Sequence, residues 1–159
     1  MIKKQVIFCV LSFLLTTTVY AQAPNEPLTI AFKPLTSGNQ TLMQLAAPQA
    51  YAFNSQDTFN QFWKQLDVTG SAAPTVDFTK NMVIAAVDKN ESSGGYTLKI
   101  TDVTLFDNAL EVDIKRELPA PDCMVSAILT QPFDIVIIPS TAAQKVSLSI
   151  NTKVVSCGS

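Results

Sequence analysis

The sequence contains no histidine, and this absence removes whole classes of catalytic site. Serine and cysteine hydrolases of the usual kind need an imidazole that takes and returns a proton near neutral pH, and many zinc sites use histidine ligands. The sequence also lacks a phosphate-binding loop and a glycine-rich dinucleotide motif. Histidine-based nucleophiles, histidine-containing zinc sites and nucleotide sites of these two kinds are therefore excluded.

Apolar runs long enough to cross a membrane are also missing. The run at residues 6–15 is short, follows a basic segment at residues 1–4, and precedes small residues at Val19 and Ala21. This order is typical of a secretory signal peptide, with Val19 and Ala21 at the −3 and −1 positions of the cleavage site. We therefore predict that residues 1–21 are removed and that the product is exported, to the periplasm or out of the cell. A buried N-terminal strand or helix is the alternative.

Positive charge is scarce in the remaining chain. Removing Lys3 and Lys4 with the leader leaves nine basic and thirteen acidic residues, a net charge of −4. Nucleic acids and anionic membrane surfaces are bound through clusters of lysine and arginine, and the sequence has none. It therefore predicts no nucleic-acid partner and no stable membrane anchor.

Cysteine is rare as well, because Cys9 lies in the leader and only Cys123 and Cys157 remain. An even pair in an exported protein favours a disulfide, which would close a loop of 33 residues and stabilise the fold by about 3 to 4 kcal/mol. The two cysteines are too far apart for a CxxC redox or zinc motif. Two free thiols or an intermolecular bridge remain alternatives, because a sequence does not supply the geometry of the bond.

One segment has a clear helical pattern. It begins at Ser55, a good N-cap residue, and Asp57 is favourably placed in its first turn. Large apolar residues then recur at i, i+3, i+4 and i+7, namely Phe59, Phe62, Trp63 and Leu66. This spacing favours a helix that packs on a sheet, with a solvent-facing aromatic binding stripe as the alternative.

Short apolar segments separated by turn residues fill most of the remaining sequence. The run at 82–87 is apolar throughout and predicts a central strand covered on both faces. Further strands are predicted at 28–32, within 42–53 with a break at Pro48, and at 96–100, 110–114, 125–129, 133–138 and 146–150. Turns or loops are predicted at 36–40, at 107–108 and at 118–122.

These elements predict a mainly β (α+β) fold, an antiparallel sandwich or partial barrel with one amphipathic helix packed on the sheet. Residues 22–27 are polar and contain proline, so we expect a flexible N-terminal segment there. Residues 28–159 are then expected to form a single β-rich domain.

Carboxylates are the remaining candidates for catalysis, since paired acids can perform acid-base chemistry. They occur singly along the chain, and most are expected to be solvated charges in loops or at sheet edges. The acidic stretch at 88–91 contains Lys89 and matches no calcium-binding spacing. We therefore expect no metal and no cofactor, with a carboxylate-dependent hydrolase as the alternative. The positions concerned are Asp77, Asp88, Asp102, Asp113 and Asp134.

Ser93, Gly94, Gly95 and Tyr96 form the most informative polar loop. Consecutive glycines permit positive φ angles and close backbone approach. The loop therefore either closes a hairpin or exposes a tip against which another molecule can lie.

Several segments in this order and spacing resemble the C-terminal domain of the PrcB family of protease-complex subunits. The helix containing Phe59, Phe62 and Trp63 lies where that family has an aromatic amphipathic helix. The resemblance covers approximately residues 50–139. The segments that carry it are 76–80, 82–85, 93–96, 129–133, 135–136 and 138–139.

The resemblance implies an exported, non-catalytic accessory or stabilising subunit, whose partner is another protein such as a secreted protease. It marks Ser93, Gly94, Gly95, Tyr96, Gln131 and Phe133 as contact positions, or as folding signatures. The family offers no catalytic residues, in agreement with the missing histidine. The alternative function is a β-sandwich protease inhibitor that inserts the loop at 93–96 into an active-site cleft.

Overall fold

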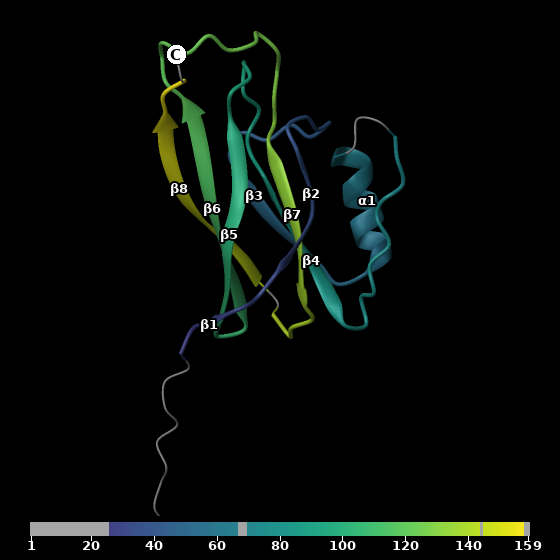
Figure 1. Ribbon diagram of the computed structural model, residues 1–159. Helices are drawn as coiled ribbons and strands as arrows, with labels where there is room; N and C mark the ends of the chain where they lie inside the picture. The colour runs from purple at the N-terminus through teal and green to yellow at the C-terminus, as the bar shows by residue number, and fades with distance from the viewer. Residues whose placement is uncertain (1–25, 67–69, 144, 158–159) are drawn as a thin grey trace, which may run out of the picture.

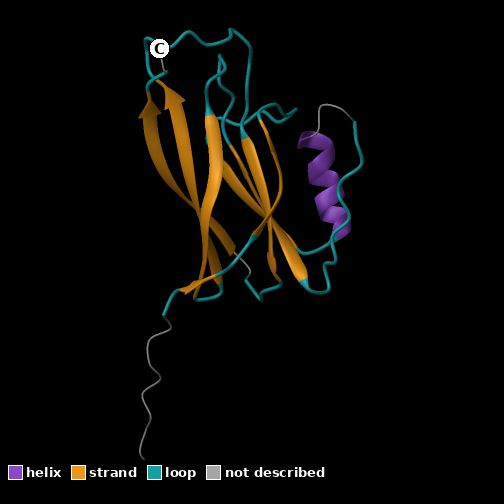
Figure 2. Cartoon of the chain, in the orientation of Figure 1, coloured by secondary structure: helices purple, strands orange, loops and turns teal. Residues whose placement is uncertain are grey.

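The computed structural model describes residues 26–66, 70–143 and 145–157, which form two β-sheets and one helix (Figures 1 and 2). Strands make up 48% of the structure and helix 9%, so the predicted mainly β fold is confirmed. The predicted leader and residues 22–25 of the predicted flexible segment lie outside the described residues. In the part of the chain that the structure describes, no helix has the length and apolar character needed to span a bilayer.

The two sheets pack face to face as a sandwich without a closed barrel (Figure 1). Sheet A contains, in spatial order, β1 (Leu28–Thr29), β5 (Thr97–Phe106), β6 (Ala109–Pro119) and β8 (Lys145–Val155). Sheet B contains β2 (Lys33–Gly38), β7 (Phe133–Pro139), β4 (Asn81–Val87) and β3 (Gln49–Phe53). The only helix of the described residues is α1 (Gln56–Leu66).

One pair of strands departs from the antiparallel arrangement that the sequence predicted. β6 and β8 run parallel, with Ala109 opposite Lys145 and Pro119 opposite Val155. The chain leaves β6, passes through β7 in the other sheet, and returns to the edge of β6 in its original direction. Sheet A is therefore mixed, while every strand pair in sheet B is antiparallel.

β4 is the central strand that its apolar sequence predicts. Met82, Ile84 and Ala86 face the core between the two sheets. Val83, Ala85 and Val87 face the opposite side, where they pack in a second core beneath α1. Because both faces are covered, polar residues cannot alternate along this strand without being buried.

α1 covers the outer face of sheet B with its four large apolar residues, which are all buried. The hydroxyl of Ser55 accepts a hydrogen bond from the backbone N–H of Thr58 at 3.3 Å and so caps the first turn. The ring of Phe62 lies 4.7 Å from that of Phe53 on β3, centroid to centroid. The aromatic stripe therefore forms core, as predicted, rather than a binding surface.

Three local predictions differ from the structure. Residues 125–129 form an irregular loop rather than a strand, since only the isolated bridge of Glu91 to Thr130 pairs near them. β2 extends to Gly38, through the first half of the predicted turn at 36–40. β6 continues to Pro119, although residues 118–122 were predicted to form a loop. Pro119 lacks only its own backbone N–H, and the N–H of the next residue, Ala120, still donates to Val155 O of β8 at 3.0 Å.

Candidate functional site

Three long connections gather at one end of the sandwich, at the top of Figure 1, opposite the β5–β6 turn. They comprise residues 39–48, 88–96 and 120–132, and the last described residues after β8 lie beside them. We call this region the loop end. All six predicted contact residues belong to it or adjoin it, because the 88–96 and 120–132 connections both lead into strands there.

A buried arginine lies beneath the loop end. Arg116 on β6 is 8% exposed, and its guanidinium donates to Asp88 Oδ2 at 2.7 Å and to Glu91 Oε1. Glu91 also forms an ion pair with Lys89 at 3.0 Å, and the ring of Tyr96 lies 5.7 Å from the guanidinium carbon. Because a buried charge is unfavourable unless it is paired, these contacts hold the 88–96 connection against sheet A.

Gln131 joins all three connections through one side chain and its backbone. Its amide nitrogen donates to the carbonyl of Asp88 at 2.8 Å, and its amide oxygen accepts from the hydroxyl of Thr41. Its backbone N–H donates to Asn39 O at 2.7 Å. Gln131 is only 2% exposed, so its observed contacts are internal ones that order the loop end.

The two glycines allow two of the connections to lie directly on each other. Gly94 is buried and donates its N–H to Ser126 O at 2.9 Å, and a Cβ at this position would collide with the hydroxyl of Ser126. Gly95 has a φ of 88°, and a Cβ there would lie 2.8 Å from Val125 Cγ1. The 120–132 connection therefore covers the glycine loop. Of the predicted loop residues, Gly95 is exposed and Ser93 and Tyr96 are partly exposed.

Phe133 and Gln131 line two neighbouring hollows of the loop end. The first, of about 240 Å³, lies between the end of β2 and the end of α1. The second, of about 300 Å³, lies between the 39–48 and 120–132 connections, and Gln40 lines both. The first is lined by Thr36, Gly38, Asn39, Gln40, Trp63, Leu66 and Phe133. The second is lined by Gln40, Thr41, Gln44, Asn90, Leu129, Thr130 and Gln131. Neither lining contains a group that titrates near neutral pH.

Large apolar side chains are exposed on two connections of the loop end, 39–48 and 120–132. Met124 is fully exposed and Leu129 is 73% exposed. The sequence reasoning missed this feature because it assigned residues 125–129 to a strand. The prolines at 119, 121 and 132 on either side of the segment were the signal that favoured a loop. We call the set the apolar rim, and its members are Leu42, Met124, Val125, Ile128 and Leu129.

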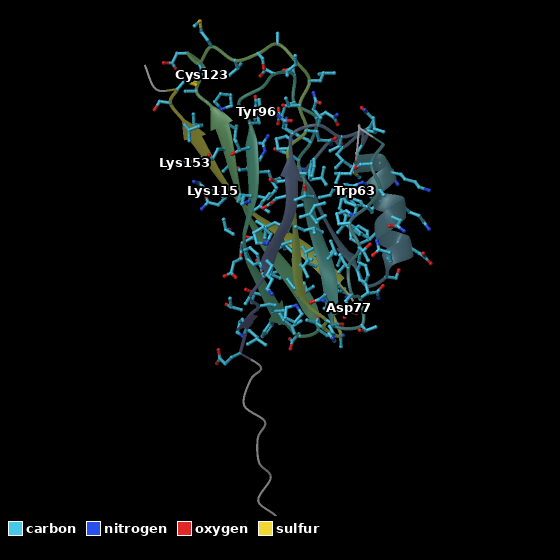
Figure 3. All side chains as sticks on the ribbon, turned by 45° about the vertical axis from the view of Figure 1, so that its right-hand side comes forward. Trp63, Asp77, Tyr96, Lys115, Cys123 and Lys153 are labelled. Atoms are coloured by element: carbon cyan, nitrogen blue, oxygen red, sulfur yellow. A yellow bond between two sulfur atoms is a disulfide. The ribbon has the colours of Figure 1, made fainter. Side chains whose placement is uncertain are left out.

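A disulfide joins Cys123 to Cys157, with Cα atoms 5.4 Å apart, so the predicted bond is present. It attaches the start of the 120–132 connection to the chain just beyond β8. Figure 3 shows Cys123 and Tyr96 together at this end of the molecule. Four of the five members of the apolar rim, all except Leu42, are therefore carried on a segment that is fixed covalently at one side and by Gln131 at the other.

Two of the five candidate carboxylates are buried, and the other three are exposed or partly exposed, in line with the expectation that most would be solvated. Asp88 is fully buried against Arg116, and Asp134 on β7 is 1% exposed. Asp134 accepts a hydrogen bond from the backbone N–H of Ile100 at 2.9 Å, at a bulge in β5, because the bulge leaves this donor without a strand partner. Both carboxylates thus satisfy internal donors, and neither lines the loop-end hollows.

Two exposed carboxylates have lowered pKa values. A hydrogen bond from the Lys115 ammonium, at 2.6 Å, lowers the pKa of Glu117 on β6. The pKa of Asp77 is lowered by the Thr79 hydroxyl, at 2.5 Å, and by the Thr79 backbone N–H. A lowered pKa keeps a carboxyl group ionised at neutral pH, so neither can act there as a general acid. Among the described residues no group of three or more cysteine and acidic side chains is arranged to hold a metal ion.

Residues 82–139 match the family described as PrcB C-terminal. The predicted resemblance is confirmed over these residues. The PrcB-like region spans β4 to β7, with the 88–96 and 120–132 connections, the Arg116 cluster and most of the apolar rim. α1 lies outside the match, although the resemblance read from the sequence began near residue 50. No curated protein and no solved structure matches the chain.

Proposed function

We propose that this protein is an exported, non-catalytic protein-binding module, an accessory or stabilising subunit of a secreted protease or of another cell-envelope complex. The observation that carries the proposal is the apolar rim, which lies on an ordered and nearly uncharged surface, mostly within the PrcB-like region. The family suggests a subunit associated with a protease complex.

The composition of the loop end fits contact with protein better than contact with nucleic acid. The 39–48 connection has no charged residue, and Asp122 is the single one in the 120–132 connection. Exposed apolar groups that gather on one surface are typical of protein interaction sites. Clusters of lysine and arginine, which nucleic acids and anionic membranes require, are not part of this surface.

Order in the rim favours binding because it lowers the entropy lost on association. The disulfide and the contacts of Gln131 restrain the 120–132 connection before a partner arrives. Each rotamer-rich side chain that is immobilised at an interface costs about 0.5 to 1.5 kcal/mol, and backbone that is already ordered does not add to this cost.

The same surface offers no group for catalysis, which supports a non-catalytic role. Both hollows are lined by amide, hydroxyl and apolar side chains. Of the carboxylates at the loop end, Asp88 and Glu91 are paired with Arg116, and Asp122 lines neither hollow. The internal disulfide is compatible with an oxidising compartment, in agreement with the predicted leader.

Replacement of two rim residues tests the proposal. Met124→Ser with Leu129→Ser should weaken binding to the native partner by about 10- to 100-fold, as loss of interface anchors does, and should leave the unfolding midpoint nearly unchanged. The measurement is quantitative co-purification of the exported protein from its native host, followed by titration against the protein recovered.

The matched control removes apolar groups at the other end of the sandwich, with Leu28→Ser and Phe106→Ser. These side chains are also exposed, at 61% and 45%, but lie outside the loop end. Equal losses in both double variants, or no partner recovered with the unaltered protein, would refute the proposed role of the rim.

The alternative, an inhibitor that inserts residues 93–96 into a protease, has less support. The 120–132 connection lies over this loop, and Gly94 is buried beneath Ser126. Rates of a panel of serine and cysteine proteases, measured with and without the purified protein, separate the two functions. Inhibition that disappears in a Tyr96→Ala variant but persists in the rim variant would favour the inhibitor.

A further inference from the structure

The free edge of β8 differs from the other sheet edges of the molecule. Of the four edge strands in the described chain, β1 has two residues and β3 has five. β2 contains Pro34 and an irregular register beside it. β8 has eleven residues, no proline and an unbroken register with β6. Short length, proline, bulges and lysine side chains are the usual devices that prevent an edge from pairing, and of these β8 has only its two lysines, Lys145 and Lys153.

Main-chain groups of β8 are available on the side away from β6. The N–H of Ala120 donates to Val155 O, so the main chain of residue 155 points toward β6. Alternate residues of a strand direct their main-chain groups to opposite sides. The groups that point away from β6 therefore belong to Val146, Leu148, Ile150, Thr152 and Val154. Within the described residues no strand pairs with this side.

The side chains of these residues form an apolar row that is only half covered. Val146 and Leu148 pack against the core between the sheets. Ile150 and Val154 lie on the same face, because side chains alternate along a strand, yet they are 45% and 59% exposed. An added strand could place apolar residues beside Ile150 and Val154 and so complete the row.

The opposite face of β8 carries only positive charge. Lys145 and Lys153 are its sole charged residues, and both are exposed. Neither forms a direct ion pair within the described residues, although Lys153 lies opposite Glu117 of β6 and, after the hydrogen bond from Lys115, its charge helps to lower the pKa of that carboxyl group. Figure 3 shows Lys153 on this side of sheet A, near Lys115. Two β8 strands side by side would bring lysines together, which disfavours a second copy of this chain as the occupant.

We propose that the free edge of β8 accepts an extended segment of a protein partner by strand addition. The segment has apolar residues on the face of Ile150 and Val154, and carboxylates on the face of Lys145 and Lys153. Main-chain hydrogen bonds supply affinity in this mode, and alternate side chains supply specificity. The inference rests on the proposed function, because it requires a protein partner, and it names the part of the chain that receives that partner.

Two synthetic peptides test the chemistry of the edge directly. One has about eight residues that alternate valine and glutamate, and the other has lysine in place of glutamate. We expect the glutamate peptide, at saturation, to slow amide hydrogen exchange of Ile150, Thr152 and Val154 by about ten-fold or more. The lysine peptide should leave these amides unchanged. No protection by the glutamate peptide, or equal protection by both peptides, would overturn the proposal.

Two variants test separately whether peptide binding requires a free main-chain N–H on the edge of β8 and whether it requires the positive charge of Lys153. Thr152→Pro removes an N–H that faces away from β6, so it should spare the sheet and abolish peptide binding, while Thr152→Val should retain it. Lys153→Glu should weaken the glutamate peptide by about ten-fold. Lys64→Glu, on the exposed face of α1, is the matched charge control and should change nothing. Unaltered binding to Thr152→Pro would refute strand addition.

The native partner distinguishes failure of this inference from failure of the proposed function. If the partner still co-purifies with Thr152→Pro but not with the rim variant, strand addition at β8 is wrong and the binding function stands. Protection of the edge amides by concentration-dependent self-association, without peptide, would identify a second copy as the occupant and would also overturn the inference.

Discussion

The two ends of the sandwich are held together by different kinds of contact. At the turn end, opposite the loop end, neighbours in sequence supply the contacts. Asp107 and Asn108 turn the β5–β6 hairpin with φ angles of 45° and 63°, and Asp77 accepts hydrogen bonds from Thr79 two residues away. At the loop end, a local ion pair is accompanied by side-chain hydrogen bonds between residues 25 to 90 positions apart. The loop end therefore depends on the whole fold, whereas the turn end is largely local.

The variant expected to destabilise the loop end most is one that removes the charged side chain of Arg116. Arg116→Met leaves Asp88 and Glu91 buried without their partner, so the free energy of unfolding should fall by about 3 to 5 kcal/mol. Urea denaturation measures the change. Adding Asp88→Asn and Glu91→Gln to the same variant should recover part of the loss. A single variant that unfolds like the unaltered protein would show that the cluster does not stabilise the loop end.

Breaking the disulfide should have a somewhat smaller effect on stability. Cys123→Ser with Cys157→Ser removes a constraint across 34 residues of sequence, and we expect a loss of about 3 kcal/mol. Limited proteolysis should then cut the 120–132 connection first, because this segment is exposed and has lost its covalent attachment. Cleavage at the turn end at an equal rate would contradict the comparison between the two ends.

Two residues with positive φ angles, one at each end of the sandwich, allow the effect of an alanine substitution to be compared between the two ends. Gly95→Ala at the loop end meets an unfavourable φ and a contact with Val125, so it should cost about 1 to 2 kcal/mol. Asn108→Ala at the turn end meets the unfavourable φ alone and should cost less than about 1 kcal/mol. Thermal unfolding of both variants measures the two losses of stability, and a larger loss for Asn108→Ala than for Gly95→Ala would contradict this prediction.

The smallest expected effect is a shift in one titration. Lys115→Met removes the hydrogen bond that lowers the pKa of Glu117, so this pKa should rise toward 4.5. Because the folded pKa is below the unfolded one, the associated stability is present above the unfolded pKa and is lost as pH falls through the folded pKa. NMR titration of the Glu117 side chain measures the shift. An unchanged pKa would show that Lys115 does not bond this carboxylate in solution.

The same contrast explains what could be predicted from the sequence. The apolar run of β4, the helical spacing of Phe59 to Leu66 and the Asp107–Asn108 turn are local patterns, and the structure has each of them. The parallel pairing of β6 with β8 and the burial of Asp88 depend on contacts between distant segments. No periodicity reports such contacts, so neither the parallel strand pair nor the burial of Asp88 could be predicted from the sequence.

The candidate site could likewise be predicted only in part, because it too depends on contacts between distant segments. The glycine pair and Gln131 stood out as local signals, and the structure brings both to the loop end. The burial of Gly94 and Gln131 could not be foreseen, because the 120–132 connection that covers Gly94 follows β6 and is distant in sequence from the 88–96 connection. Exposure of the apolar rim likewise follows from the lack of a neighbouring strand for residues 125–129. The contact role of the six predicted residues stays a prediction.

The position of Cys157 just beyond β8 gives the disulfide a further consequence for how the chain assembles. If β8 slid along β6 by two residues, its Cα atoms would move about 6.6 Å and the two cysteines would no longer be within bonding distance. A slip of one residue would reverse the faces of β8 as well. Within the folded sandwich the bond is therefore compatible only with the correct alignment of β8, and once formed it prevents β8 from slipping along β6.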